Sequence, residues 1–167
     1  AGIRPSGTMS HSLAILMGDT VRAVQAFDSH MPPEVPRIVV VGTLKDETEE
    51  SLNVARQLRD RLRGIRLDTA RELGGVGPYM VKEVRARLDQ ANFNHVEITV
   101  SGDITPDRIR EFRNANSPVD SFGVGIHISS GPPIGFTADI HEVDGKPLAR
   151  RGRIPGNTNN PHLERIF

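Results

Sequence analysis

The sequence has no cysteine and no tryptophan, and its 167 residues include a single tyrosine. The absence of cysteine excludes a disulfide framework, a thiolate zinc site, an iron–sulfur cluster and a cysteine nucleophile. Aromatic residues make up only 4% of the chain, so its hydrophobic core must be built from Val, Ile, Leu and Ala.

Net charge and long apolar runs are missing too. The 21 Lys and Arg residues balance 21 Asp and Glu residues, which argues against nucleic acid or an anionic membrane as the main partner. No apolar run approaches the roughly 20 residues that a membrane-spanning helix needs, and residues 1–5 lack the layout of a secretion signal. We therefore expect a soluble, cytoplasmic protein with no nucleic-acid and no membrane partner.

Short apolar segments alternate with segments of helical spacing. Strands are expected at 37–43, 64–69, 95–102 and 121–128, with residues 7–11 as a candidate fifth. Helices are expected at 49–63, at 78–91, from residue 105, and from Asp19 upstream of the first strand. The alternation of strand and helix predicts a parallel sheet in an α/β fold.

Two architectures fit this alternation: an open doubly wound sheet and part of a (β/α)8 barrel. No G-x-G-x-x-G follows the first strand, which weakens the dinucleotide-binding version of the open sheet. A complete barrel needs roughly 250 residues, so a barrel of this length would be about half complete. We expect a partial (β/α)8-type barrel over residues 1–148 and an irregular C-terminal tail over residues 149–167.

Polar residues and glycines gather where the predicted strands end. They are Gly42-Thr43, Arg66 with Asp68-Thr69, Ser101-Gly102-Asp103, and Gly123-Val124-Gly125. Ligands of parallel α/β folds sit at these carboxyl ends, and glycines let backbone amides approach an anion closely. The group of residues therefore indicates a site for a phosphorylated sugar.

Each of these features also has a structural interpretation. Arg66 and Asp68 share one face of their strand, where burial would require them to be paired or liganded, but on an edge strand they would be a solvated pair. The glycines at 123 and 125 could relieve crowding in a barrel. His11 precedes an apolar helix and could be structural, and Asp103 could be a turn residue or a helix cap.

With these residues in place, the chain resembles nicotinate phosphoribosyltransferase, particularly the archaeal-type branch. The matching segments are GTMSHS at 7–12, GDTVRAVQAFD at 18–28, VPRIVVVGTLKDE at 35–47, IRLDT at 65–69, VKEVRARLDQANFNHVEITVSGD at 81–103, VDSFGVGIHIS at 119–129 and EVDGKPLARRGRIPG at 142–156. The set is specific because its members occur in the family's order, and it corresponds to the C-terminal half of the family's chain.

The resemblance implies an α/β barrel that joins nicotinate to 5-phosphoribosyl 1-pyrophosphate, giving nicotinate mononucleotide and pyrophosphate. It also implies Mg²⁺ on the departing pyrophosphate and, in ATP-coupled members, a histidine that can be phosphorylated. As partners it implies a homo-oligomer or a complementing N-terminal half, since the family's N-terminal domain and early strands have no counterpart in this sequence.

The same resemblance implies roles for single residues. Asp68 corresponds to the catalytic aspartate near the ribose and His11 to the histidine that can be phosphorylated. Arg66 corresponds to the arginine near the nicotinate carboxylate, and Thr43 and Thr69 beside the strand ends are expected to bind substrate. The expected phosphate-binding residues are Ser101, Gly102, Asp103, Gly123 and Gly125. No residue is assigned as a metal ligand.

Three positions depart from the family pattern: Gly42 stands in place of an aspartate, Asp103 in place of a glycine and Ile126 in place of a threonine. They favour an alternative in which the chain is a non-catalytic remnant or split subunit acting in assembly.

A third hypothesis is a different phosphosugar enzyme, an isomerase or aldolase. That chemistry calls for a strand-end lysine or glutamate, and the mapped strand ends carry only Lys45, just past one of them.

Overall fold

The structure is a computed structural model that describes residues 7–135, 137–156, 159 and 161. The chain divides into two compact units, Ala1–Gly131 and Pro132–Phe167. The predicted domain boundary after residue 148 stays a prediction, and much of the predicted tail (157–158, 160 and 162–167) lies outside the described residues.

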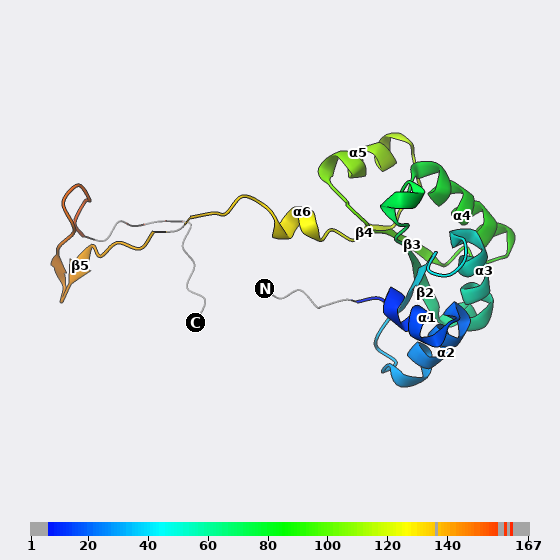
Figure 1. The fold of residues 1–167 in the computed structure, drawn as a ribbon. Coiled ribbons are helices and arrows are strands. Elements are labelled where there is room, and N and C mark those ends of the chain that lie inside the picture. Colours follow the sequence, from blue (N-terminus) through cyan, green and yellow to red (C-terminus); the bar gives the residue numbers. More distant parts are fainter. Residues whose placement is uncertain (1–6, 136, 157–158, 160, 162–167) are drawn as a thin grey trace. The chain divides into compact units, whose positions relative to one another are not determined.

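The first unit is built on one sheet of four strands (Figure 1). They are β1 (Arg37–Val41), β2 (Leu62–Leu67), β3 (Glu97–Val100) and β4 (Ser121–Phe122). Each neighbouring pair is parallel, and the spatial order β1-β2-β3-β4 follows the chain. A doubly wound sheet reverses its order at a switch point, whereas successive barrel strands do not. The expected partial barrel with parallel strands is confirmed.

Helices connect the strands and precede the first one. They are α1 (His11–Met17), α2 (Thr20–His30), α3 (Glu47–Leu58), α4 (Pro78–Gln90), α5 (Pro106–Asn114) and the short α6 (Ile126–Ser129), with 3-10 turns η1 (Arg59–Arg61) and η2 (Arg71–Leu73). Asp19 and Thr105 cap α2 and α5 as expected, each accepting a backbone amide with its side chain. Within the described part of the chain, no helix is long and apolar enough to cross a membrane.

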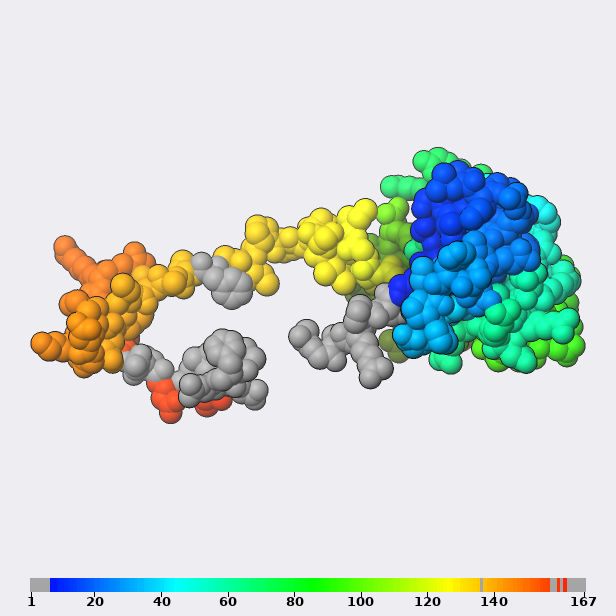
Figure 2. All heavy atoms as spheres, turned by 90° about the horizontal axis from the view of Figure 1, so that it is seen from below, coloured from blue at the N-terminus to red at the C-terminus, as the bar shows by residue number. Residues whose placement is uncertain are grey.

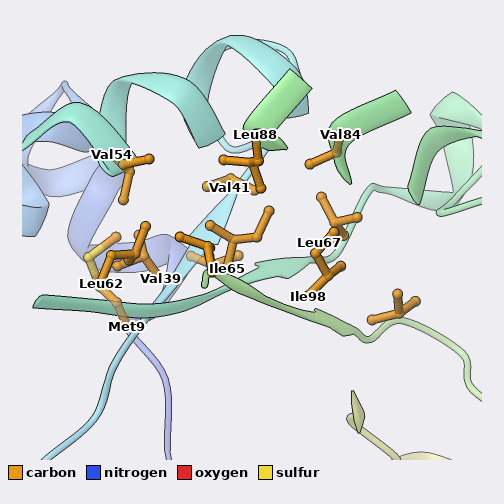
Figure 3. Packing of buried hydrophobic residues seen from close by; sticks show 14 of the residues in the cluster. Met9, Val39, Val41, Val54, Leu62, Ile65, Leu67, Val84, Leu88 and Ile98 are labelled. Carbon is orange, nitrogen blue, oxygen red and sulfur yellow. The ribbon is translucent and has the colours of Figure 1, made fainter. Parts of the chain in front are cut away.

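The core of the first unit lies between the sheet and α3 and α4, which pack side by side on one face of it (Figures 1 and 3). Val54, Val84 and Leu88 project from these helices towards Ile65 and Leu67 of β2 (Figure 3). These five side chains are at most 1% exposed. Each contributes about 1.5–3 kcal/mol by leaving water, so the helix-covered face carries most of the apolar stabilisation.

The opposite face of the sheet carries a row of side chains that is apolar on β1 and polar from β2 to β4. Val40, Arg66, Thr99 and Ser121 are register partners across the four strands, so their side chains lie on the same face. The Thr99 and Ser121 hydroxyls are hydrogen-bonded at 2.8 Å. Because alternate residues of a strand point to opposite faces, one face of the sheet forms the apolar core and the other carries polar side chains near the strand ends.

Three expectations about local structure are wrong. Residues 7–10 form no strand: Met9 donates one backbone hydrogen bond to Ile38, and α1 begins immediately afterwards at His11. The predicted helix 49–63 ends at Leu58, because Arg59 has a φ of +52° and Leu62 already begins β2. The predicted strand 121–128 keeps only two residues, since 123–125 leave the sheet and 126–129 form α6.

The turn from β1 to α3 is closed by a buried carboxylate. Glu50, 2% exposed, accepts the backbone amides of residues 42–45 at 2.8–3.2 Å. It also accepts the Thr20 hydroxyl at 2.5 Å, which ties α2 to the same turn. Figure 2 shows α1 and α2 as a continuous surface of the first unit, next to α3. Because Glu50 fills this cradle of amides, the β1 turn is not open to an external anion.

The second unit contains a hairpin of β5 (Glu142–Val143) and β6 (Lys146–Pro147). Its turn, Asp144-Gly145, has positive φ at both residues, +50° and +74°, as a two-residue hairpin turn requires. In the same unit Asp139 pairs with Arg150 and Arg153 at 2.7 and 2.9 Å. These contacts give this unit local order of its own.

The first prediction concerns Glu50. Replacing it with alanine leaves four amides and a hydroxyl without their acceptor, so Glu50→Ala should lower the free energy of unfolding by about 2–4 kcal/mol. Its neighbour Glu49, whose side chain is 48% exposed, makes only a surface ion pair with Lys45, and Glu49→Ala is the matched control with little expected change. Urea unfolding of both variants measures the difference, and equal effects would contradict this role of Glu50.

Candidate functional site

A hollow of about 750 Å³ opens where β2, β3 and β4 end. Its wall includes seven of the residues predicted from the sequence: Arg66, Asp68, Ser101, Gly102, Asp103, Gly123 and Gly125. It also includes residues that the sequence analysis did not name as binding residues, namely Gly7, Thr8, Thr99, Ile104, Thr105, Val124, Ile126, His127 and Ser130. The predicted clustering of strand-end residues around one cavity is therefore present in the structure.

Asp68 lies at the centre of the charged part of this site. Its Oδ2 is 3.6 Å from Nη1 of Arg66 and 3.6 Å from Nε2 of His11. Its Oδ1 lies 2.9 Å from where a Cβ of residue 102 would be, so only glycine at that position leaves the carboxylate room. Asp68 is 26% exposed, which makes it accessible to a ligand while the two basic groups face it.

Asp68 faces only one nitrogen of the Arg66 guanidinium group. Its side chain is 22% exposed, and its Nε is the one buried side-chain nitrogen or oxygen without a hydrogen-bond partner among the described residues. An unsatisfied buried donor costs about 1–3 kcal/mol. The β2 strand is central rather than an edge strand, so the solvated-pair interpretation of Arg66 and Asp68 is wrong. A mostly buried cation on a central strand needs more compensation than one contact of 3.6 Å with Asp68 provides.

His11 and Thr43 stand behind Asp68 rather than on the wall of the hollow. His11 Nδ1 is 2.9 Å from the Thr43 hydroxyl, and its Nε2 faces Asp68. The imidazole therefore connects the ends of β1 and β2. The structure places His11 at the site, and it reaches the hollow through Asp68.

Thr69 lies on a neighbouring hollow of about 480 Å³, which shares Asp68, Gly102 and Asp103 with the first. The Thr69 side chain is buried, and its hydroxyl donates to Glu47 Oε1 at 2.5 Å. Its proton is therefore engaged within the protein. The substrate-binding role predicted for Thr69 and Thr43 stays a prediction.

The glycines around the hollow have different structural reasons. Gly102 has a φ of +91°, in the region that favours glycine, whereas a Cβ at Gly123 would lie 3.0 Å from Cβ of Ser101. The crowding interpretation thus applies to Gly123, but it does not apply to Gly125, which has open space around it. Asp103 has a φ of +49° and is exposed at the junction of the two hollows.

The donor set fits a magnesium ion only in part. Asp68 and Asp103 offer hard oxygen ligands on the walls of both hollows. The described residues contain no group of three or more His, Cys, Asp or Glu side chains placed to hold a metal ion. Mg²⁺ is usually bound by one or two carboxylates together with substrate phosphates, and these two aspartates match that mode.

Lys45 is not suited to the covalent chemistry of the third hypothesis. Its ammonium donates to Glu49 Oε1 at 2.6 Å, and this hydrogen bond raises the pKa of Lys45 above its ordinary value. A lysine held in its charged form is a poor nucleophile. The structure gives no support to Schiff-base formation at this position.

Another hollow, of about 600 Å³, lies where β1 and β2 begin. Its Arg37 donates to Asp28 Oδ1 and to the carbonyls of Asp28, Met31, Pro32 and Val35 at 2.5–2.9 Å. These bonds use every nitrogen of the guanidinium group to hold the end of α2. This hollow is accounted for by structure, so the strand-end hollow is the candidate site.

Comparison with known proteins places this strand-end site in a family. The family model for the quinolinate phosphoribosyl transferase C-terminal domain matches residues 1–139. Nicotinate phosphoribosyltransferase pncB2 of Mycobacterium tuberculosis is 33% identical over 171 residues, covering 99% of this chain and 35% of the relative. Nicotinate phosphoribosyltransferase of Bacillus subtilis is 28% identical over 148 residues, covering 84% of this chain and 29% of the relative.

A solved structure agrees with these relatives. The crystal structure of nicotinate-nucleotide pyrophosphorylase from Pyrococcus furiosus matches with a TM-score of 0.74 at 40% identity, covering 93% of this chain and 39% of that one. The fold and the site thus define a phosphoribosyltransferase-type α/β barrel segment. The chain belongs to the family of quinolinate phosphoribosyl transferase C-terminal domains. It spans about a third of the length of the curated relatives, and the resemblance drawn from the sequence is confirmed.

The second prediction concerns Asp103, whose charge stands beside the predicted phosphate position. Asp103→Gly should tighten binding of inorganic phosphate by about fivefold, because a like charge about 4 Å away in water costs about 1 kcal/mol. Asp144→Gly is the matched control, because it relieves a nearly equal φ of +50° at a residue that lines neither hollow. Isothermal titration measures both affinities, and weaker binding by Asp103→Gly would show that this carboxylate assists the anion.

Proposed function

We propose that the chain forms the phosphoribosyl-binding part of a nicotinate phosphoribosyltransferase, which transfers phosphoribosyl from 5-phosphoribosyl 1-pyrophosphate to nicotinate. The observation that carries the proposal is Asp68, which stands between Arg66 and His11 on the same hollow as the glycine turns at 102 and 123–125. The carboxylate suits a sugar on which positive charge develops during the reaction. The guanidinium suits the carboxylate of nicotinate, and the open backbone turns suit the phosphate of the sugar substrate.

Arg66 suits the nicotinate carboxylate. A guanidinium presents a planar fork of donors that matches a carboxylate in two hydrogen bonds. Only one side of this fork faces Asp68, and the Nε of Arg66 lacks an acceptor. A bound carboxylate would offer two acceptor oxygens and a charge opposite to that of the guanidinium, whereas an uncharged amide offers one oxygen and no charge, and this difference is the basis for preferring nicotinate.

Asp68 suits the reacting carbon of the ribose. In the proposed reaction the nicotinate ring nitrogen bonds to C1 while the C1–oxygen bond to pyrophosphate breaks, and the bonding electrons leave with that oxygen. Positive charge develops on the ribose, where a fixed carboxylate stabilises it. Mg²⁺ held by Asp68 and Asp103 together with the pyrophosphate would neutralise charge on the leaving group.

The anionic end of the substrate belongs at the β3 and β4 turns. The β1 turn already holds the Glu50 carboxylate, whereas Gly102 and Gly125 border the hollow with no side chain of their own.

ATP coupling through His11 is part of the proposal. So is completion of the barrel by a second copy or by an N-terminal half, since β1 and β4 are the outer strands of the described sheet.

The third prediction tests this function. Asp68→Ala should lower turnover about 10²-fold, because it removes a charge that stabilises the transition state. The free energy of unfolding should fall by no more than about 1 kcal/mol, because the contacts of Asp68 with Arg66 and His11 are long, at 3.6 Å, and partly exposed. Asp60→Ala, at an exposed aspartate of the opposite hollow, is the control and should keep full turnover. The assay follows radiolabelled nicotinate into nicotinate mononucleotide, with quinolinate and nicotinamide tested as competing acceptors.

Because the curated relatives are about three times as long, the assay is run on the chain alone and with the N-terminal part of a relative added. Product that depends on Asp68 in either mixture supports the proposal. Absence of product from every mixture, or unchanged turnover in Asp68→Ala, would contradict it. Transfer to quinolinate in preference to nicotinate would correct the acceptor and leave the phosphoribosyl chemistry in place.

A further inference from the structure

Glu47 is a second carboxylate at the strand ends, and the reaction proposed above does not use it. It is the first residue of α3, and its side chain reaches across to the segment that follows β2. There its Oε1 accepts the Thr69 hydroxyl at 2.5 Å. Thr69 is 8% exposed and directly follows Asp68, so this hydrogen bond is anchored in buried backbone next to the site.

The space that Glu47 occupies exists because residue 42 is glycine. A Cβ at Gly42 would lie 2.8 Å from both Cγ and Oε1 of Glu47, closer than real carbon contacts allow. A side chain at position 42 would therefore force the carboxylate away from Thr69. The glycine that departs from the family pattern at this strand end and the reach of Glu47 are two parts of one arrangement.

Glu47 and Glu50 have separate tasks on the same helix. Glu50 is fully buried, and its carboxylate accepts hydrogen bonds from the amides of residues 42–45, so it holds the β1 turn. Glu47 is half-buried, and its side chain contacts Thr69, directly after β2, instead. Within the described part of the chain, no basic side chain lies within ion-pair distance of Glu47, so its orientation follows from Thr69 and the free space above Gly42.

We propose that Glu47 is a positioning residue: by accepting the Thr69 hydroxyl, it fixes the backbone after β2 and so keeps Asp68 between Arg66 and His11. The consequence for phosphoribosyl binding rests on the proposed function, but the positioning itself does not. The arrangement needs an acceptor at Glu47 and a hydroxyl at Thr69, and it does not need the negative charge of Glu47.

The fourth prediction uses His11 as a reporter of where Asp68 stands. The imidazole signals of His11 are measured by nuclear magnetic resonance, assigned with His11→Asn, and Asp68→Asn gives the position they take without the carboxylate charge. Glu47→Ala and Thr69→Val should both move them towards that position. Glu47→Gln should leave them in place, because an amide oxygen still accepts the hydroxyl proton.

Gly42→Ala displaces Glu47 without removing it. Because the next residue, Thr43, holds His11, only the part of its effect that disappears when Glu47 is also replaced by alanine is assigned to Glu47. Gly18→Ala is its matched control, with a φ of +65° against +81° and no atom within 4 Å of the new Cβ. Both variants carry backbone strain, but only Gly42→Ala should move the His11 signals. Unchanged His11 signals in Glu47→Ala, or equal changes in the two glycine variants, would overturn the proposal.

Binding of ribose 5-phosphate separates this proposal from the proposed function. Glu47→Ala and Thr69→Val should weaken it about tenfold, since small displacements of a positioned group have large effects, and Glu47→Gln should match the unaltered chain. If Glu47→Gln weakens binding as much as Glu47→Ala while Thr69→Val does not, the charge of Glu47 acts directly and positioning is wrong. If ribose 5-phosphate binds neither to the unaltered chain nor to its mixture with the N-terminal part of a relative, the proposed function fails, and the His11 signals still decide the role of Glu47.

Discussion

The site depends on one constraint, which is that charged groups at the end of a central parallel strand must be compensated in place. Arg66 and Asp68 are separated by one residue at the end of β2, with strands on both sides. Each is mostly removed from water, so each needs a partner of opposite charge or a ligand. Asp68 obtains its partners from two directions, Arg66 on its own strand and His11 from the start of α1.

The surrounding elements follow from that requirement. Glu50 fixes the β1 turn and thereby the place of Thr43, which holds His11. Gly102 leaves the space that the Asp68 carboxylate occupies. Fixed charges of this kind cost little reorganisation when a charged substrate binds, and for that reason rigid strand ends are suited to reactions in which charge develops on a sugar.

Periodicity and topology made much of this predictable. The four strands, their parallel order and the common wall formed by Arg66, Asp68 and the later glycines follow from strand–helix alternation and from the rule that ligands bind at carboxyl ends. Thr99 could have been found in the same way, since it is the register partner of Arg66. His127 was missed because residues 121–128 read as one strand, whereas residues 126–129 fold as α6.

The roles of Glu47 and Glu50 could not be read from the sequence. Their run of acidic residues is equally well explained by the favourable charge of a helix N-terminus. What distinguishes them is the direction of each side chain, and that depends on the turn at 42–45 and on the space above Gly42. Such contacts join segments that only the folded chain brings together.

The central claim is that one strand-end hollow holds the phosphoribosyl substrate. Mapping of backbone amide shifts on adding 5-phosphoribosyl 1-pyrophosphate with Mg²⁺ tests it most directly. The account predicts that residues 66–69, 101–105 and 123–127 respond together at a common dissociation constant. Responses confined to the opposite hollow, around 35–37 and 60–63, would contradict it.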